Sequence, residues 1–126
     1  MSFFILIEMI LFHIIADFNL QGILADFKQK SWWKQNVPEK LYSHDWLISL
    51  IIHSFTWAVF MMLPIAIFKQ GVPDVWFYVL LAVNIIVHAI IDDFKANKLK
   101  ISLVTDQICH LGQIILTFTL LSTIYR

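Results

Sequence analysis

Residues 88–92 read His-Ala-Ile-Ile-Asp and close an apolar run that begins near Val75. In a helix, residues four apart lie on one face at successive turns, so His88 and Asp92 would present an imidazole and a carboxylate side by side. The same spacing recurs in two other apolar runs, as His13 with Asp17 and, in reverse order, as Asp106 with His110. An ionisable group in so hydrophobic a segment requires a partner, a proton or a metal ion. The pairs therefore indicate a common polar site.

The composition indicates a membrane protein. Of the 126 residues, 60% are hydrophobic and 14% are charged, which leaves too little polar surface to cover a soluble core. Apolar runs of roughly the 20 residues that a helix needs to cross a bilayer cover residues 3–24, 46–68, 75–94 and 103–124. Isolated strands would leave backbone groups unpaired in lipid. We therefore predict an all-α integral membrane four-helix bundle with up-down threading, forming a single transmembrane domain over residues 1–126.

The connections suggest an orientation. Residues 25–45 mix lysines with aromatic residues such as Trp32 and Trp33, which is typical either of an interfacial helix in the headgroup region or of a solvated loop with aromatic anchors. Lysines are concentrated in this connection and in residues 95–102. By the positive-inside rule, both connections are expected on the cytoplasmic side of the inner (cytoplasmic) membrane, with the two termini outside.

Charge and cysteine content exclude several classes of function. Nine basic and nine acidic residues give a formal net charge of zero, so no overall field points to a nucleic acid partner. The single cysteine, Cys109, excludes an intramolecular disulfide and a cysteine-rich zinc site. The expected partner is the lipid bilayer.

Up-down threading predicts that the polar residues of the runs meet at one depth. The residues concerned are His13, Asp17, His53, His88, Asp92, Asp106 and His110. With alternating direction, all of them fall in the cytoplasmic half of the membrane, where facing one another is far less costly than facing lipid. Imidazole and carboxylate ligands without a thiolate suit one or two divalent ions, such as Zn, Mn, Fe or Mg, and two ions would share a carboxylate. The alternative is a set of buried ion pairs that only satisfy one another.

Further polar residues lie near these candidates. They are Gln21, Asn84, Lys95, Gln107 and Gln113. Such residues can orient the imidazoles and carboxylates or contact a substrate. Lys95, three residues after Asp92, is either a lysine that extends to the membrane interface or an anion-binding group beside the metal ions.

These motifs also occur together in a known family. They are His13-Ile-Ile-Ala-Asp17-Phe-Asn-Leu-Gln21, His53, His88-x-x-x-Asp92-x-x-Lys95 and Asp106-Gln107-x-x-His110. With them the chain resembles, over nearly its whole length, a family of small bacterial and phage membrane proteins called domain of unknown function 3307. That family brings no established activity. A looser likeness to membrane-bound metal-dependent hydrolases, and of His-x-x-x-Asp to a ligand pattern of helical zinc phospholipases and nucleases, implies metal-dependent hydrolysis, although the further histidine-rich motifs of those enzymes are absent.

Three functions compete at this stage. The favoured one is a metal-dependent hydrolase that acts on a lipid or another phosphoester or ester at the cytoplasmic leaflet. No Ser-His-Asp triad or glycine-rich phosphate loop is present. The second is a proton or metal-ion conduit, which would require a homo-oligomer because four spans are few for a pore. The third is a non-catalytic membrane protein in which a metal ion or a His-Asp network joins the helices.

Overall fold

The computed structural model describes residues 1–125, which form helices and connecting turns with no strand among them. In chain order the elements are α1 (Phe3–Ile14), the π-helical turn η1 (Ile15–Asn19), α2 (Leu24–Phe27), α3 (Lys30–Asn36), the 3₁₀ turn η2 (Lys40–Tyr42), α4 (Asp45–Phe68), α5 (Val75–Ala96) and α6 (Leu103–Ile124). The predicted all-α class is confirmed.

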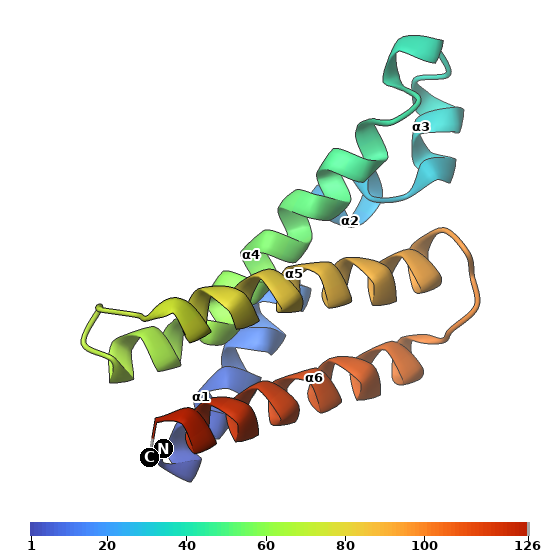
Figure 1. The fold of residues 1–126 in the computed structure, drawn as a ribbon. Coiled ribbons are helices and arrows are strands. Elements are labelled where there is room, and N and C mark those ends of the chain that lie inside the picture. Colours follow the sequence, from blue (N-terminus) through green and yellow to red (C-terminus); the bar gives the residue numbers. More distant parts are fainter. Residues whose placement is uncertain (126) are drawn as a thin grey trace.

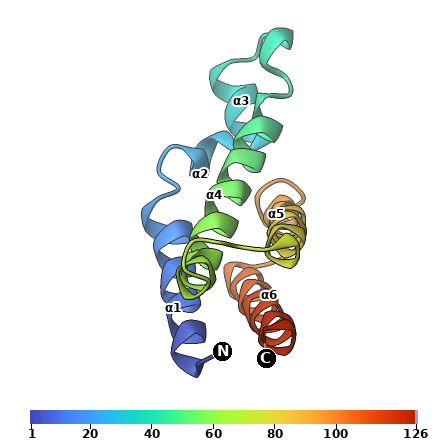
Figure 2. The same ribbon diagram turned by 60° about the vertical axis from the view of Figure 1, so that its left-hand side comes forward.

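The helices are arranged as two pairs that cross (Figure 1). One pair is α1 and α4, which lie side by side, and the other is the antiparallel hairpin of α5 and α6. Figure 2 views the hairpin nearly along its helices and shows α1 and α4 standing across it. The start of α1 and the end of α6 lie near each other in both views. All four helices therefore meet where the two pairs cross.

Three helical segments are long and apolar enough to cross a membrane. They are Lys40–Phe68, Val75–Ala96 and Leu103–Ile124. The long helices α4, α5 and α6 within them begin and end within two residues of the predicted runs. Their outward faces carry exposed large side chains such as Phe55, Ile86 and Ile115. Such faces are typical of helices whose solvent is lipid.

The first apolar run differs from the prediction. Helical structure was expected over residues 3–24, but it ends at Asn19. The 12 residues of α1 and five of η1 rise roughly 25 Å at about 1.5 Å per residue, somewhat less than a bilayer core of about 30 Å. The chain then turns at Gly22, whose φ of +47° lies in the left-handed region that glycine adopts at little cost.

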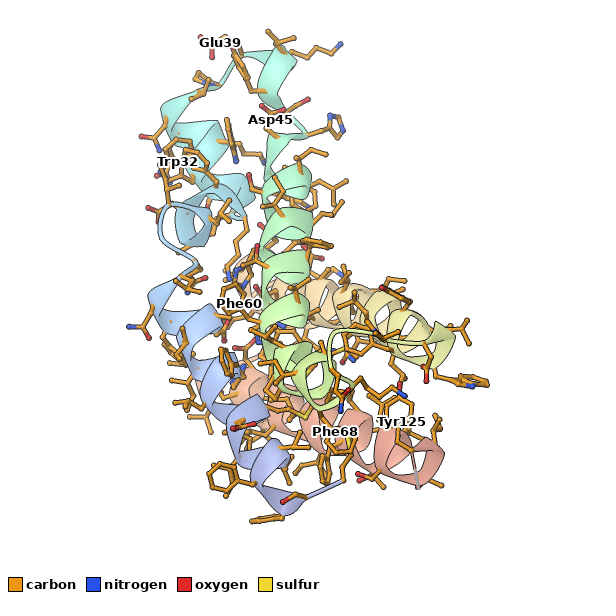
Figure 3. The ribbon with its side chains drawn as sticks, turned by 90° about the vertical axis from the view of Figure 1, so that its left-hand side faces the viewer. Trp32, Glu39, Asp45, Phe60, Phe68 and Tyr125 are labelled. Atoms are coloured by element: carbon orange, nitrogen blue, oxygen red, sulfur yellow. The ribbon has the colours of Figure 1, made fainter. Side chains whose placement is uncertain are left out.

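Residues 25–45 form short helices. The helix α3 ends before Pro38, as expected for a residue that restricts its predecessor to extended backbone. The Trp33 indole donates a 2.7 Å hydrogen bond to the carbonyl of Phe27, and the rings of Phe27 and Trp32 lie 4.6 Å apart. Figure 3 shows Trp32, Glu39 and Asp45 at the end of the molecule opposite Phe68 and Tyr125.

The apolar core occupies the half of the molecule nearer the termini. Met9, Trp57, Ile65, Ile114 and Leu121 have no exposed surface. In α1, α4 and α6 these residues lie between the candidate histidine and the helix end that is nearer the chain termini. We call this the terminal side of the histidines. The buried apolar core therefore closes one side of the group of polar residues.

A side-chain hydrogen bond joins the end of α6 to the start of α5. The Tyr125 hydroxyl donates a 2.8 Å hydrogen bond to Asp74 Oδ1, and Asp74 also accepts from the backbone N–H groups of Trp76 and Phe77 as the N-cap of α5. The hydrogen bond from Tyr125 is the main cause that holds the pKa of Asp74 below its ordinary value. Burial, together with the Asp74 charge, raises the pKa of Tyr125 to about 12.

Replacing Tyr125 with Phe is expected to lower the unfolding temperature at pH 7 by a few degrees, because it removes this hydrogen bond. A raised pKa stabilises the fold below the ordinary tyrosine value of about 10, and that stabilisation is lost as the pH rises toward about 12. The lowered pKa of Asp74 works in the opposite sense, so its contribution is lost below about pH 4. Unfolding in detergent should therefore show the difference from wild type shrinking at both extremes. Tyr78→Phe, at an exposed tyrosine of α5, is the control; equal stability of both variants at pH 7 would contradict the expectation.

Candidate metal centre

The seven predicted ligands come together where the helix pairs cross. His13 is on α1, Asp17 on η1, His53 on α4, His88 and Asp92 on α5, and Asp106 and His110 on α6. None of these side chains belongs to a residue that is more than 3% exposed. We call these seven residues the His/Asp cluster. Its π-helical turn η1, closed by the Leu20 N–H to Ile15 carbonyl bond, carries Asp17, and π turns are frequent at functional sites.

Histidine Nε2 atoms converge on the carboxylates of the cluster. His53 Nε2 lies 3.3 Å from Asp17 Oδ1, 3.3 Å from Asp92 Oδ2 and 3.3 Å from His88 Nε2. His110 Nε2 lies 3.3 Å from Asp106 Oδ1 and 3.7 Å from Asp92 Oδ1. Asp92 thus lies among three histidines, with Oδ1 toward His110 and Oδ2 toward His53 and, at 3.8 Å, His88.

Three overlapping triads of the cluster could hold a metal ion. They are Asp17–His53–His88, His88–Asp92–His110 and Asp17–Asp106–His110. Within each triad the ligand atoms lie within 4.8 Å of one another. A set of imidazole and carboxylate atoms without thiolate suits zinc, manganese or iron, and its carboxylates also suit magnesium.

Several buried atoms of the cluster have no hydrogen-bond partner among the described residues. They include Asp92 Oδ1, Asp106 Oδ1, His88 Nδ1 and both ring nitrogens of His110. A buried polar atom without a partner costs roughly 1–3 kcal/mol. A cation bound among the carboxylate oxygens and His110 would satisfy several of them at once, so the residues fit a metal ion.

His13 differs from the other histidines because both of its ring nitrogens are occupied. The Trp57 indole donates a 2.7 Å hydrogen bond to His13 Nδ1, which leaves the ring proton on Nε2, 3.1 Å from Gln107 Oε1. His13 belongs to none of the three triads. In this arrangement it positions Gln107 instead of offering a free ligand atom.

Gln107 connects two carboxylates of the cluster. Its Nε2 donates to Asp17 Oδ2 at 2.8 Å and to Asp106 Oδ2 at 3.0 Å. The amide orientation is set by His13, which occupies the Gln107 oxygen. Gln107 therefore lies where the sequence analysis expected a supporting residue.

Two lysines form ion pairs with two of the three carboxylates. Lys28 Nζ lies 2.6 Å from Asp92 Oδ2 and donates to Gln21 Oε1 at 3.0 Å, while Lys95 Nζ lies 2.7 Å from Asp106 Oδ2. Lys95 had been interpreted either as a lysine that extends to the membrane interface or as an anion-binding group beside the metal ions, and in the structure it pairs with Asp106. Lys28 was not anticipated, because it belongs to the lysine-rich connection, yet it is only 4% exposed. The amide of Asn97 holds the backbone carbonyl of Lys28 at 3.1 Å and so fixes this connection against the end of α5.

Asn84 and Gln113 form a separate polar network. Gln113 Nε2 donates to Asn84 Oδ1 at 2.7 Å, and Asn84 Nδ2 donates to Thr117 Oγ1 at 3.0 Å. These bonds join α5 to α6 on the terminal side of the cluster. The two residues thus bind the hairpin together, and neither contacts the cluster through a hydrogen bond within residues 1–125.

Aromatic stacking closes the terminal side of the cluster. The Trp57 ring stacks on His88 and His88 stacks on His110, each at 4.2 Å between ring centroids. Trp57, His88 and His110 have no exposed surface. The stack fixes the ring planes of two histidines and separates them from the apolar half of the molecule.

Comparison with known proteins identifies a family but no individual curated protein or solved structure. A search of curated proteins and a search of solved structures each give no match. The family model described as "Protein of unknown function (DUF3307)" matches residues 5–125, nearly the whole chain and all seven residues of the His/Asp cluster. The chain therefore belongs to the DUF3307 family, as its motifs had suggested.

Proposed function

We propose that this protein is a membrane-embedded, divalent-metal-dependent hydrolase that acts on a lipid or another phosphoester or ester at the cytoplasmic leaflet. One observation carries the proposal: three overlapping triads of buried imidazole and carboxylate groups contain polar atoms that have no hydrogen-bond partner within residues 1–125. Two divalent ions close together are a common arrangement in phosphoesterases.

Two ions fit the cluster best if they share Asp17. Any two of the triads have one residue in common, which is Asp17, His88 or His110. A carboxylate has two oxygens and can bridge two ions, whereas a neutral imidazole has one free lone pair. Asp17, His53 and His88 would therefore hold one ion, and Asp17, Asp106 and His110 would hold the other.

The surrounding residues suit hydrolytic chemistry. The chemistry that divalent ions supply when bound is activation of water and stabilisation of charge on a phosphoryl or acyl oxygen. Gln107 holds Asp17 and Asp106 in place through its two N–H donors. Trp57 and the core beneath it exclude water from the terminal side, which strengthens electrostatic interactions in the cluster.

The same buried apolar core disfavours the alternative function, a proton or metal-ion conduit. A conduit needs a polar path through the membrane, but Trp57, Met61 and Ile65 fill the α4 side of the core without exposed surface. The network of Asn84, Gln113 and Thr117 is closed by its own hydrogen bonds. The buried apolar residues and this closed network favour an enclosed site over a channel.

We further propose that α1 with η1 crosses the membrane as the shortest of four spans, giving an up-down bundle that is one domain over residues 1–126. The nearness of the start of α1 to the end of α6 supports this threading. Lys28 and Lys95 lie at the opposite end of the cluster, and most lysines of the chain belong to the connections at this end. By the positive-inside rule we therefore propose that this end faces the cytoplasm and that both termini lie outside the inner membrane.

Protein purified without chelators is expected to contain one or two divalent ions per chain, measured by elemental analysis. It should cleave a phosphoester or ester presented in mixed micelles, lose this activity on chelation and regain it when the metal is restored. His88→Ala should lower turnover by more than about 100-fold, because it removes a ligand of two triads. His44→Ala, at an exposed histidine, is the control.

Two results would replace the proposal. Ion or proton flux into liposomes that His88→Ala abolishes, without turnover, would establish a conduit. Stoichiometric metal whose removal lowers the unfolding temperature, with no substrate of either class cleaved, would establish a structural metal.

A further inference from the structure

A cavity of about 320 Å³ adjoins the His/Asp cluster on its lysine-rich side. Its lining includes Gln21, Lys28 and Gln29 from the first connection and Lys95 from the last turn of α5. Lys28 and Lys95 are the two lysines whose ammonium groups contact Asp92 and Asp106. Two lysine ammonium groups therefore lie between the cavity and the His/Asp cluster.

The charges of the site favour an anion in this cavity. Three aspartates and two lysines leave one net negative charge when the histidines are neutral, as ligand histidines must be. One divalent ion changes this to one positive charge, and two ions change it to three. Excess positive charge in a buried site is costly unless an anion compensates it.

The ammonium groups of Lys28 and Lys95 have N–H donors beyond those used in their hydrogen bonds within residues 1–125. An ammonium group has three N–H donors. Lys28 uses two of them, toward Asp92 and Gln21, and Lys95 uses one, toward Asp106. The Lys95 side chain is 26% exposed, against 5% for Lys28, so Lys95 lies nearer the cavity mouth. The remaining donors can bind an oxyanion beside the triads.

We propose that this cavity binds the phosphate group of the substrate through Lys28 and Lys95, which makes the substrate a phosphoester and not a neutral ester. This inference rests on the proposed metal centre. The cavity is at the lower end of the range for ligand sites, so it accepts a headgroup and leaves any acyl chains outside. A lipid headgroup and a free phosphate compound share this chemistry.

The test uses full-length, metal-loaded protein in detergent and inorganic phosphate as the probe, with titration calorimetry as the readout. Phosphate should bind wild type, and Lys95→Gln should weaken binding by about tenfold or more, as expected for loss of a charged hydrogen bond. Lys95→Arg should retain binding. Lys98→Gln is the matched control, because Lys98 follows Lys95 by three residues but pairs with Asp93 and does not line this cavity. Equal binding by Lys95→Gln and Lys98→Gln, or no binding to wild type, overturns the inference.

A second measurement needs no variant. Phosphate should protect Lys95 of the wild-type protein from an amine-acylating reagent, while Lys98 stays reactive, as read by mass spectrometry. Unchanged Lys95 reactivity contradicts the inference even if Lys95→Gln fails to fold.

A competition experiment with lipids distinguishes a lipid headgroup from a soluble phosphate compound. In nanodiscs, phosphatidic acid should compete with inorganic phosphate if the ligand is a lipid headgroup, whereas phosphatidylcholine alone should not. Phosphate binding without this competition assigns the cavity to a soluble phosphate compound. Metal content is measured on every sample: bound metal without phosphate binding rejects only this inference, and absent metal rejects the proposed function with it.

Discussion

Replacing Asp92 with Asn is expected to lower the free energy of unfolding by about 3–5 kcal/mol, the range for removing one partner of a buried ion pair. Asp92 has no exposed surface and its Oδ2 lies 2.6 Å from Lys28 Nζ, which is itself 4% exposed. Asparagine would leave the Lys28 ammonium buried without a counter-charge. Chemical unfolding of chelator-treated protein in detergent would measure the change separately from metal binding.

Two further variants make this expectation specific. Asp93→Asn removes the neighbouring carboxylate, which pairs with the half-exposed Lys98 at 3.3 Å, and should cost about 1 kcal/mol or less. Combining Asp92→Asn with Lys28→Met should restore much of the lost stability, because the unpaired charge is then absent. A loss in Asp92→Asn no larger than that in Asp93→Asn would show that the ion pair contributes little.

The long helices could be predicted because the length of an apolar run decides them. A run of about 20 apolar residues bounded by turn residues leaves little choice of structure in lipid. The helix α6, at Leu103–Ile124, has the predicted bounds, and α5 extends two residues further than expected. The first run could not be bounded this way, since its end depends on the turn at Gly22 and not on loss of hydrophobicity.

The crossing of the helix pairs was beyond sequence reasoning. A repeated polar spacing tells which residues share a face, but the angle between helices depends on how the side chains of both fit together. Up-down threading alone was enough to expect His53 at the depth of Asp17 and Asp92. It could not have shown that three triads overlap, because that depends on the crossing point.

The environment of individual polar residues was also hidden in the sequence. Lys28 lies in a segment without periodicity, so nothing indicated that it turns inward to Asp92. The one available signal was charge: three buried aspartates with only Lys95 near them require another cation. For His13, the partner Trp57 lies 44 residues away, and an indole that donates to an imidazole has no signature in spacing.

For the proposed centre of two ions, Asp17→Asn is expected to leave one bound ion per chain. Asp17 is the carboxylate common to two triads, so its loss leaves His88–Asp92–His110 as the complete set. An amide oxygen is a weaker ligand than a carboxylate and carries no charge to bridge two cations. Elemental analysis of protein loaded with zinc or manganese would give the stoichiometry, with Asp26→Asn, an exposed aspartate in α2, as the control. Activity should fall with the second ion, because the charge stabilisation that two divalent ions would supply together requires both of them. Two ions retained in Asp17→Asn would mean that the ions are bridged elsewhere, and the assignment of Asp17 as the shared ligand would have to be abandoned.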